Sequence, residues 1–335
     1  MSGRRVGIIG TGFMGEVHAA AWRAIGSPPT AILARSATPR PAYLRDREVD
    51  IYDDLQMFLA AVDIVDICAP THLHAGFALA AAAAGKPAIC EKPLSLSVEE
   101  GLEVIRAFEE AGVHLHVGHI LRYSPDYTAA RQAVEAGRIG EPAVLRLSRL
   151  SFAPERGEAS WFQDDSKSGG IAFDLMIHDL DYARWIAGEV VSVFAKSATN
   201  SRGHAIAILK HSGGAISHIE SSWSSPAPEF RTSFEIAGEH GVLGCSSADT
   251  TPLALRLHEE RNDSSTGLGD MSLAANPFEL ELQNFLGVID GTARPAITAR
   301  DALAAVQLAA AVRQSARTGQ PVAIESMGKV NTWSA

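Results

Sequence analysis

The stretch VGIIGTGFMG, residues 6–15, places a GxGxxG motif between a short apolar run and an amphipathic segment. In such a strand–turn–helix context, the first glycine permits a tight turn and the second lets the backbone approach a pyrophosphate. The third allows close packing of the helix on the strand. The N–H groups at the helix N-terminus then face the phosphates. The motif therefore predicts a dinucleotide site formed by Gly10, Gly12, Phe13, Met14 and Gly15.

Short apolar runs alternate with longer helical patterns through the first third of the chain. The expected strands cover residues 5–10, 30–34, 64–69, 88–91 and 114–118, and the expected helices cover 15–25, 53–61, 74–85 and 98–111. Ser97 and Glu100 form a capping-box pattern, and Gly85, Gly112 and Gly137 stand where helices should end. Strands that alternate with helices predict βαβ units on a parallel sheet. We therefore expect a Rossmann dinucleotide-binding domain over residues 1–122.

Beyond this domain the pattern changes to β-rich runs with fewer helices. The expected strands cover residues 143–152, 190–198, 204–210, 215–222 and 230–237, and the expected helices cover 175–187, 278–291 and 300–318. Runs of antiparallel strands predict an α+β arrangement. The expected fold class is therefore α/β, with the Rossmann domain followed by a C-terminal α+β domain, residues 123–335. That domain should contain a large, mostly antiparallel open sheet and bind the substrate.

The composition restricts the partners of the protein. The formal net charge of −10 over 335 residues argues against nucleic acid and against an anionic membrane, because both require a surplus of Lys and Arg on one face. Cys68, Cys90 and Cys245 form no CxxC pair, so neither a disulfide framework nor a zinc knuckle is implied. No apolar stretch reaches the length of a membrane-spanning helix. We expect a cytoplasmic protein.

The end of the second expected strand bears on the choice of cofactor. A protein that prefers NAD usually carries Asp or Glu there, which bonds the ribose 2′-hydroxyl. This chain has Arg35 and Ser36 instead. A guanidinium and a hydroxyl suit a 2′-phosphate, and no carboxylate repels it. The sequence thus predicts NADP in preference to NAD, the alternative being that Arg35 is a solvated surface charge.

The stretch AICEKPLS, residues 88–95, places Lys92 at the end of an expected parallel strand. Ligands of open α/β sheets bind outside the carboxyl ends of the strands, so Lys92 should lie where the nicotinamide sits. Pro93 excludes the helical conformation at Lys92 and aims its side chain.

Together with GxGxxG, three further motifs resemble those of the Gfo/Idh/MocA oxidoreductase family. They are Glu91-Lys92-Pro93, Gly118-His119 with Arg122, and Ser168-Gly-Gly170 followed by Asp174-x-x-x-His178-Asp179-x-Asp181. The resemblance covers almost the whole chain. It implies an NAD(P)-dependent oxidoreductase acting on a CH–OH group of a sugar, cyclitol or related polyol. It also implies a C-terminal sheet that faces a partner subunit in a homodimer or homotetramer, and a cis Lys92–Pro93 peptide bond.

The resemblance identifies Lys92, Asp174 and His178 as the catalytic set. Oxidation of a secondary alcohol removes a hydroxyl proton while hydride leaves the carbon, and histidine starts near the pKa that such a base needs. We expect His178 to take the proton and Lys92 to stabilise the developing alkoxide. Asp174, four residues before His178 and on the same face of an α-helix, would fix the imidazole or the substrate hydroxyl. The structural alternatives are a surface lysine and a helical histidine without chemistry.

Further site residues are expected around this set. Cofactor contacts are expected from Ala69, Pro70, Thr71, His74, Glu91 and Lys92, and substrate contacts from His119, Arg122, Tyr123 and Trp161. The substrate residues fit a packing role equally well. Many inositol-type members have Asn where this chain has Thr71, which leaves the substrate open.

Two other functions fit the same motifs. One is a glycoside hydrolase that retains NAD, and the other is an NAD(P)-binding metabolite sensor without catalysis. The complete Lys92, Asp174 and His178 set argues against the sensor. No metal site is expected, because the histidines at 72, 74, 114, 116 and 119 come with neither a cysteine pair nor HExxH.

Overall fold

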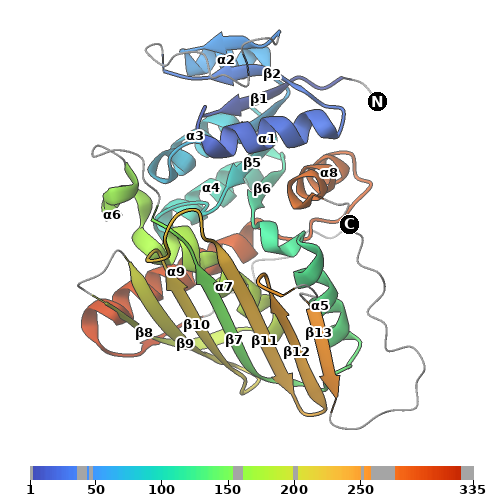
Figure 1. Ribbon diagram of the computed structural model, residues 1–335. Coiled ribbons are helices and arrows are strands. Elements are labelled where there is room, and N and C mark those ends of the chain that lie inside the picture. The colour runs from blue at the N-terminus through green and yellow to red at the C-terminus, as the bar shows by residue number, and fades with distance from the viewer. Residues whose placement is uncertain are drawn as a thin grey trace. The chain divides into compact units, whose positions relative to one another are not determined.

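A computed structural model describes residues 3–35, 44, 48–153, 161–198, 203–249 and 276–325, and the backbone of 253–257. The chain forms two compact units, each discontinuous in sequence (Figure 1). The first unit comprises Met1–Gln132, Glu155–Asp174 and Arg261–Val306, and the second comprises Ala133–Pro154, Leu175–Glu260 and Gln307–Ala335. The first unit thus contains two segments that follow the Rossmann pattern in the sequence.

The first unit is built on a parallel sheet, which confirms the predicted Rossmann fold. Its described strands run in the order β3 (Asp50–Tyr52), β2 (Pro29–Leu33), β1 (Val6–Ile9), β4 (Ile64–Ile67), β5 (Ala88–Glu91) and β6 (Leu115–Gly118). The helices between them are α1 (Phe13–Ala24), α2 (Leu55–Ala61), α3 (His74–Ala83) and α4 (Val98–Ala111). Strands β1, β4 and β5 are buried at every residue, as expected of strands covered on both faces.

Local capping agrees with the sequence. The Ser97 side chain accepts a hydrogen bond from Glu100 N at the start of α4, and Gly112 ends that helix with φ +65°. Two helices of this unit extend the Rossmann pattern. One is α5 (Pro125–Glu135), which begins in this unit and of which only the end, at Gly137, was expected from the sequence. The other is α8 (Pro277–Ile289), which lies beside α1 in Figure 1 and buries Leu282 and Phe285 with Trp22.

The second unit contains a mixed, mostly antiparallel sheet, as predicted. The described strands run in the order β13 (Leu253–Leu257), β12 (Gly241–Ser246), β11 (Arg231–Gly238), β7 (Pro142–Leu150), β10 (Ile216–Ser222), β9 (His204–His211), β8 (Val190–Ser197) and β14 (Val322–Ala323). Only β7 and β10 pair in parallel among these strands. Helix α7 (Ile177–Ala187) packs against β7 and β10 and buries Tyr182 against Phe234. Strands β12, β13 and β14 were not predicted.

The C-terminal part of the described chain holds α9 (Ala299–Thr318), close to the predicted 300–318. In the part of the chain that the structure describes, no helix combines the length and apolar character needed to cross a membrane.

Candidate active site

The glycine turn has the backbone that a dinucleotide requires. Gly10 follows β1 with φ +111°, and a Cβ there would lie 2.5 Å from the carbonyl oxygen of Cys68. Only glycine fits this position. Gly12 is the N-cap of α1, and no side chain of the described residues caps that helix, whose first turn contains Phe13, Met14 and the buried Gly15. The turn therefore suits a pyrophosphate held by backbone N–H groups.

The loop after β4 meets the loop after β5 through His74. Its Nδ1 lies 2.7 Å from Pro93 O, and its Nε2 lies 2.8 Å from Ala69 O. The pKa of His74 is lowered, mainly by burial, although the hydrogen bonds to the two carbonyls favour the charged ring and raise the pKa. Both ring nitrogens thus contact carbonyl oxygens of the protein. This favours a role for His74 in holding the two loops together over a direct hydrogen bond to a cofactor. Thr71, which opens η2 (Thr71–Leu73), is buried.

Lys92 contacts Asp174 at the carboxyl end of β5. The Lys92–Pro93 peptide bond is cis, as the resemblance implies. Lys92 Nζ donates to Asp174 O at 2.5 Å and to Asp174 Oδ1 at 3.2 Å, with the side chains 15% and 20% exposed. Asp174 lies in η5 (Ala172–Met176), a π-helical turn, and such turns recur at functional sites. Two members of the predicted catalytic set are therefore in contact within the first unit.

The segment before Asp174 also reaches this edge of the parallel sheet. It forms η4 (Trp161–Gln163) and the short helix α6 (Asp165–Ser168), and α6 packs against η2. The Trp161 ring lies 6.3 Å from the His72 ring. Gly169 and Gly170 turn the chain with φ +78° and +69° before η5. The predicted substrate residue Trp161 thus lies beside the loop that follows β4.

His178 is the second residue of α7 and belongs to the second unit. The expected shared face of Asp174 and His178 assumed α-helical spacing, whereas residues 172–176 form a π turn with i→i+5 bonds. Asp179, the next residue, accepts hydrogen bonds from Arg149 Nε at 2.8 Å and Nη2 at 3.0 Å. This buried ion pair fastens the start of α7 to β7. Arg149 was not expected from the sequence, because an arginine in a strand is ordinarily exposed.

The remaining predicted residues fall into two groups. Arg35 is exposed directly after β2, and Ser36 lies outside the described residues. The other group is buried in the first unit: His119, Arg122, which donates to Ala296 O at 3.1 Å, and Tyr123, which donates to Asn284 Oδ1 at 2.9 Å. These contacts favour packing roles for Arg122 and Tyr123.

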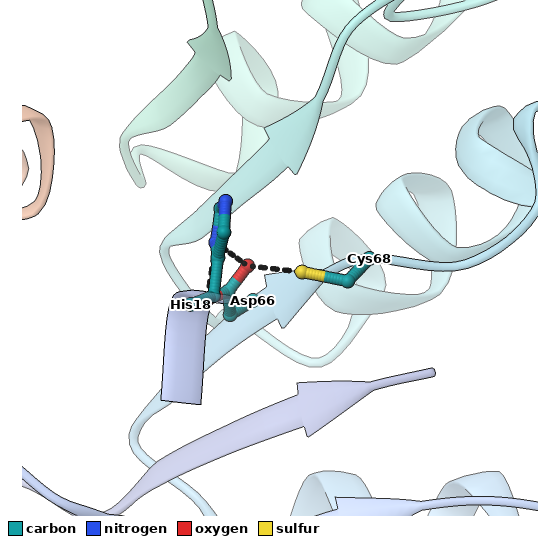
Figure 2. A group of neighbouring side chains, drawn as sticks. All are labelled: His18, Asp66 and Cys68. Atoms are coloured by element: carbon teal, nitrogen blue, oxygen red, sulfur yellow. Dashed lines mark hydrogen bonds and ion pairs between the residues drawn. The ribbon is translucent and has the colours of Figure 1, made fainter. Parts of the chain in front are cut away.

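A buried polar cluster that was not predicted from the sequence contacts Glu91, the residue before Lys92 at the end of β5. Figure 2 shows the Asp66 carboxylate between the His18 ring and the Cys68 sulfur. Asp66 Oδ2 accepts from Trp22 Nε1 at 2.7 Å and from His18 Nδ1 at 2.9 Å, and Oδ1 accepts from Cys68 Sγ at 3.3 Å. The His18 Nε2 atom lies 3.0 Å from Glu91 Oε1. These donor types also occur at metal sites, but hydrogen bonds account for the contacts here.

Two family models match the chain. The oxidoreductase family model with an NAD-binding Rossmann fold matches residues 4–119, and the GFO/IDH/MocA C-terminal domain matches residues 127–244. The chain belongs to the Gfo/Idh/MocA oxidoreductase family. The resemblance drawn from the motifs is therefore confirmed, and the first unit carries the NAD-binding Rossmann fold of this family.

Several proteins similar to this chain are named as dehydrogenases or reductases of sugars and cyclitols. The chain is 28% identical over 336 residues to 1,5-anhydro-D-fructose reductase of Ensifer adhaerens, a match that covers 96% of this chain and 99% of the relative. It is 28% identical over 340 residues to myo-inositol 2-dehydrogenase of Thermotoga maritima, with 96% and 99% covered. The solved levoglucosan dehydrogenase in complex with NADH and levoglucosan shares the fold, with a TM-score of 0.83, 24% identity, and 97% and 100% covered.

Proposed function

We propose that this Gfo/Idh/MocA protein is an NAD(P)-dependent dehydrogenase or reductase that acts on a secondary alcohol or ketone of a sugar, cyclitol or related polyol. The observation that carries the proposal is the Lys92–Asp174 contact at the carboxyl end of β5, the edge at which open α/β sheets bind their ligands. The names of the similar dehydrogenases and reductases support the substrate class.

The proposal assigns one role to each member of the catalytic set. A bound nicotinamide supplies the hydride acceptor or donor. Lys92 holds positive charge beside the substrate oxygen, which stabilises an alkoxide as it develops. Asp174 fixes the Lys92 ammonium through two contacts. His178 accepts the hydroxyl proton in oxidation and returns it in reduction. Trp161 is assigned to the substrate, on account of its place beside the loop after β4.

The proposed cofactor is NADP in preference to NAD. Arg35 supports this choice, because it is exposed directly after β2 and no acidic residue takes its place. Titration of nicotinamide fluorescence should show tighter binding of NADPH than of NADH. Arg35→Asp should reverse that order, whereas Arg106→Asp, at an exposed position of α4, should leave it unchanged. Tighter binding of NADH by the unchanged protein would contradict the assignment.

A panel of polyols and sugars with the tighter-binding cofactor tests the reaction. The expected result is reversible nicotinamide reduction by at least one polyol. Glycoside cleavage without net reduction, by protein that retains NAD through gel filtration, would instead support the hydrolase.

We also propose that copies of the chain associate through the outer face of the C-terminal sheet. Four exposed apolar side chains share that face on adjacent strands, Phe194 on β8, Ile206 and Ile208 on β9, and Ile216 on β10. Burial of such a patch stabilises association. Light scattering after gel filtration should give a dimer or tetramer for the unchanged protein and a smaller species for Ile208→Lys. A monomeric unchanged protein would contradict this.

A further inference from the structure

We propose that His18 is a positioning residue for Lys92. His18 is the middle member of a buried Asp66–His18–Glu91 chain and acts on Lys92 through Glu91. The inference rests on the proposed function, because it assigns His18 a role toward the lysine of that reaction. His18 lies on α1, Asp66 on β4 and Glu91 at the end of β5, so three elements of the first unit meet at one imidazole.

Both nitrogens of the His18 ring face carboxyl oxygens. Nδ1 lies 2.9 Å from Asp66 Oδ2, and Nε2 lies 3.0 Å from Glu91 Oε1. A carboxylate only accepts hydrogen bonds, so both contacts are satisfied when the imidazole carries a proton on each nitrogen. The side chains of His18 and Asp66 are fully buried, and that of Glu91 is 9% exposed. An imidazolium between two carboxylates is thus the arrangement that satisfies these groups.

The surroundings of His18 favour the same protonation state. Burial is the largest single influence and disfavours the imidazolium, but the interactions with Asp66 and Cys68 together outweigh burial, and the pKa of His18 is raised well above its usual value. Burial likewise opposes ionisation of Glu91, but the His18 hydrogen bond and charge lower its pKa overall. Other titratable groups close to His18 are Cys68, Cys90 and, on α8, Glu281, and burial raises the pKa of each. Burial therefore favours the neutral form of these groups.

Glu91 connects His18 to the backbone of Lys92. Its Oε2 atom accepts the Lys92 backbone N–H at 3.1 Å, while Oε1 is held by His18. Gly118 on the neighbouring strand lies beside the Glu91 carboxyl group, and a Cβ there would meet it at a van der Waals distance of 3.4 Å. On the other side of Lys92, His74 contacts the Pro93 carbonyl. The backbone of Lys92 is therefore fixed at its own amide and at the next residue, and its Nζ reaches Asp174 from this fixed base.

The kinetic test compares His18→Gln, Glu91→Gln, the double variant and the control Cys68→Ala. The control removes a hydrogen bond to the same Asp66 carboxylate without touching Glu91. We expect His18→Gln to lower kcat about 10-fold to 100-fold, the range for residues that orient an active group, with cofactor Kd within about twofold of the parent. Cys68→Ala should keep kcat. The double variant should be no slower than Glu91→Gln, because the two residues act as one unit. Additive losses, or unchanged kcat in His18→Gln, would overturn the proposal.

A second readout needs no substrate. In protein labelled with ¹⁵N at histidine, NMR should show both His18 ring nitrogens protonated at neutral pH. The backbone amide proton of Lys92 should shift in His18→Gln but not in Cys68→Ala. A neutral His18 ring at neutral pH, or an unmoved Lys92 amide, would overturn the proposal. If no polyol or sugar is turned over, the proposed function fails, and the NMR result still decides the role of His18. The ring measurement on the unchanged protein also stands if His18→Gln does not fold.

Discussion

Removal of the Asp179 carboxylate should destabilise the second unit strongly. Arg149 and Asp179 form a bidentate ion pair at 2.8 and 3.0 Å, with side chains only 5% and 1% exposed. Breaking a buried pair by removing one partner typically costs about 3–5 kcal/mol, because the other charge stays out of water without its counter-ion. We therefore expect Asp179→Ala to lose about 3–5 kcal/mol of unfolding free energy.

The first unit offers a matched control for this variant. Arg5 and Asp63 form a pair of similar geometry, 3.2 and 2.8 Å, but their side chains are 51% and 40% exposed. Exposed pairs contribute at most about 1 kcal/mol, so Asp63→Ala should cost far less than Asp179→Ala. A double variant, Arg149→Met with Asp179→Leu, should recover much of the loss, because apolar replacement of a whole buried pair is often neutral.

Hydrogen exchange followed by mass spectrometry suits this comparison, because it reports each unit separately. Peptides from α7, residues 177–187, should exchange much faster in Asp179→Ala, while peptides from α4, residues 98–111, should keep the parent rate. Urea unfolding then gives the total change. Equal losses of stability in Asp179→Ala and Asp63→Ala would contradict a large contribution from the buried pair, and so would a double variant less stable than Asp179→Ala.

Two further changes test the turn and the core of the first unit. Gly10→Ala should weaken NADPH binding at least about tenfold, because the added Cβ would lie 2.5 Å from Cys68 O. The control is Gly26→Ala, at a glycine that also has positive φ but is surrounded by open space. Equal Kd values for the two variants would contradict the prediction. Burial lowers the pKa of His116 from 6.5 to about 3, so acid favours the unfolded chain, which takes up this proton while the folded protein does not. The loss should reach about 3 kcal/mol by pH 4.5. His116→Gln should lose less stability between pH 7 and pH 4.5 in urea unfolding, and an equal acid loss in both proteins would argue against this.

Local patterns in the sequence were enough to predict the parallel sheet, the glycine turn and the place of Lys92. Each depends on residues close together in the chain. Gly10 requires its positive φ because of the turn that it makes, and Ser97 caps α4 three residues from its partner. Lys92 could be placed because a residue after a buried strand of a parallel sheet must lie at the carboxyl edge.

The features that the sequence did not predict depend on contacts between distant segments. Asp66 looks like one polar residue in an apolar run, and its partners His18 and Trp22 lie on another element. The same holds for Arg149, whose burial depends on how α7 packs on β7. The short β14 has only two residues and little pattern of its own. Sequence spacing identifies elements and their ends, whereas these contacts arise from tertiary packing.

In the proposed reaction, Lys92 supports hydride transfer between a nicotinamide and a polyol or sugar. The most direct measurement is the rate of nicotinamide reduction by the best substrate of the panel, for the unchanged protein and for Lys92→Met, together with the cofactor Kd of both. We expect Lys92→Met to lose about 100-fold or more in kcat, with the cofactor bound as tightly as before. A variant that turns over the substrate at the parent rate would contradict it.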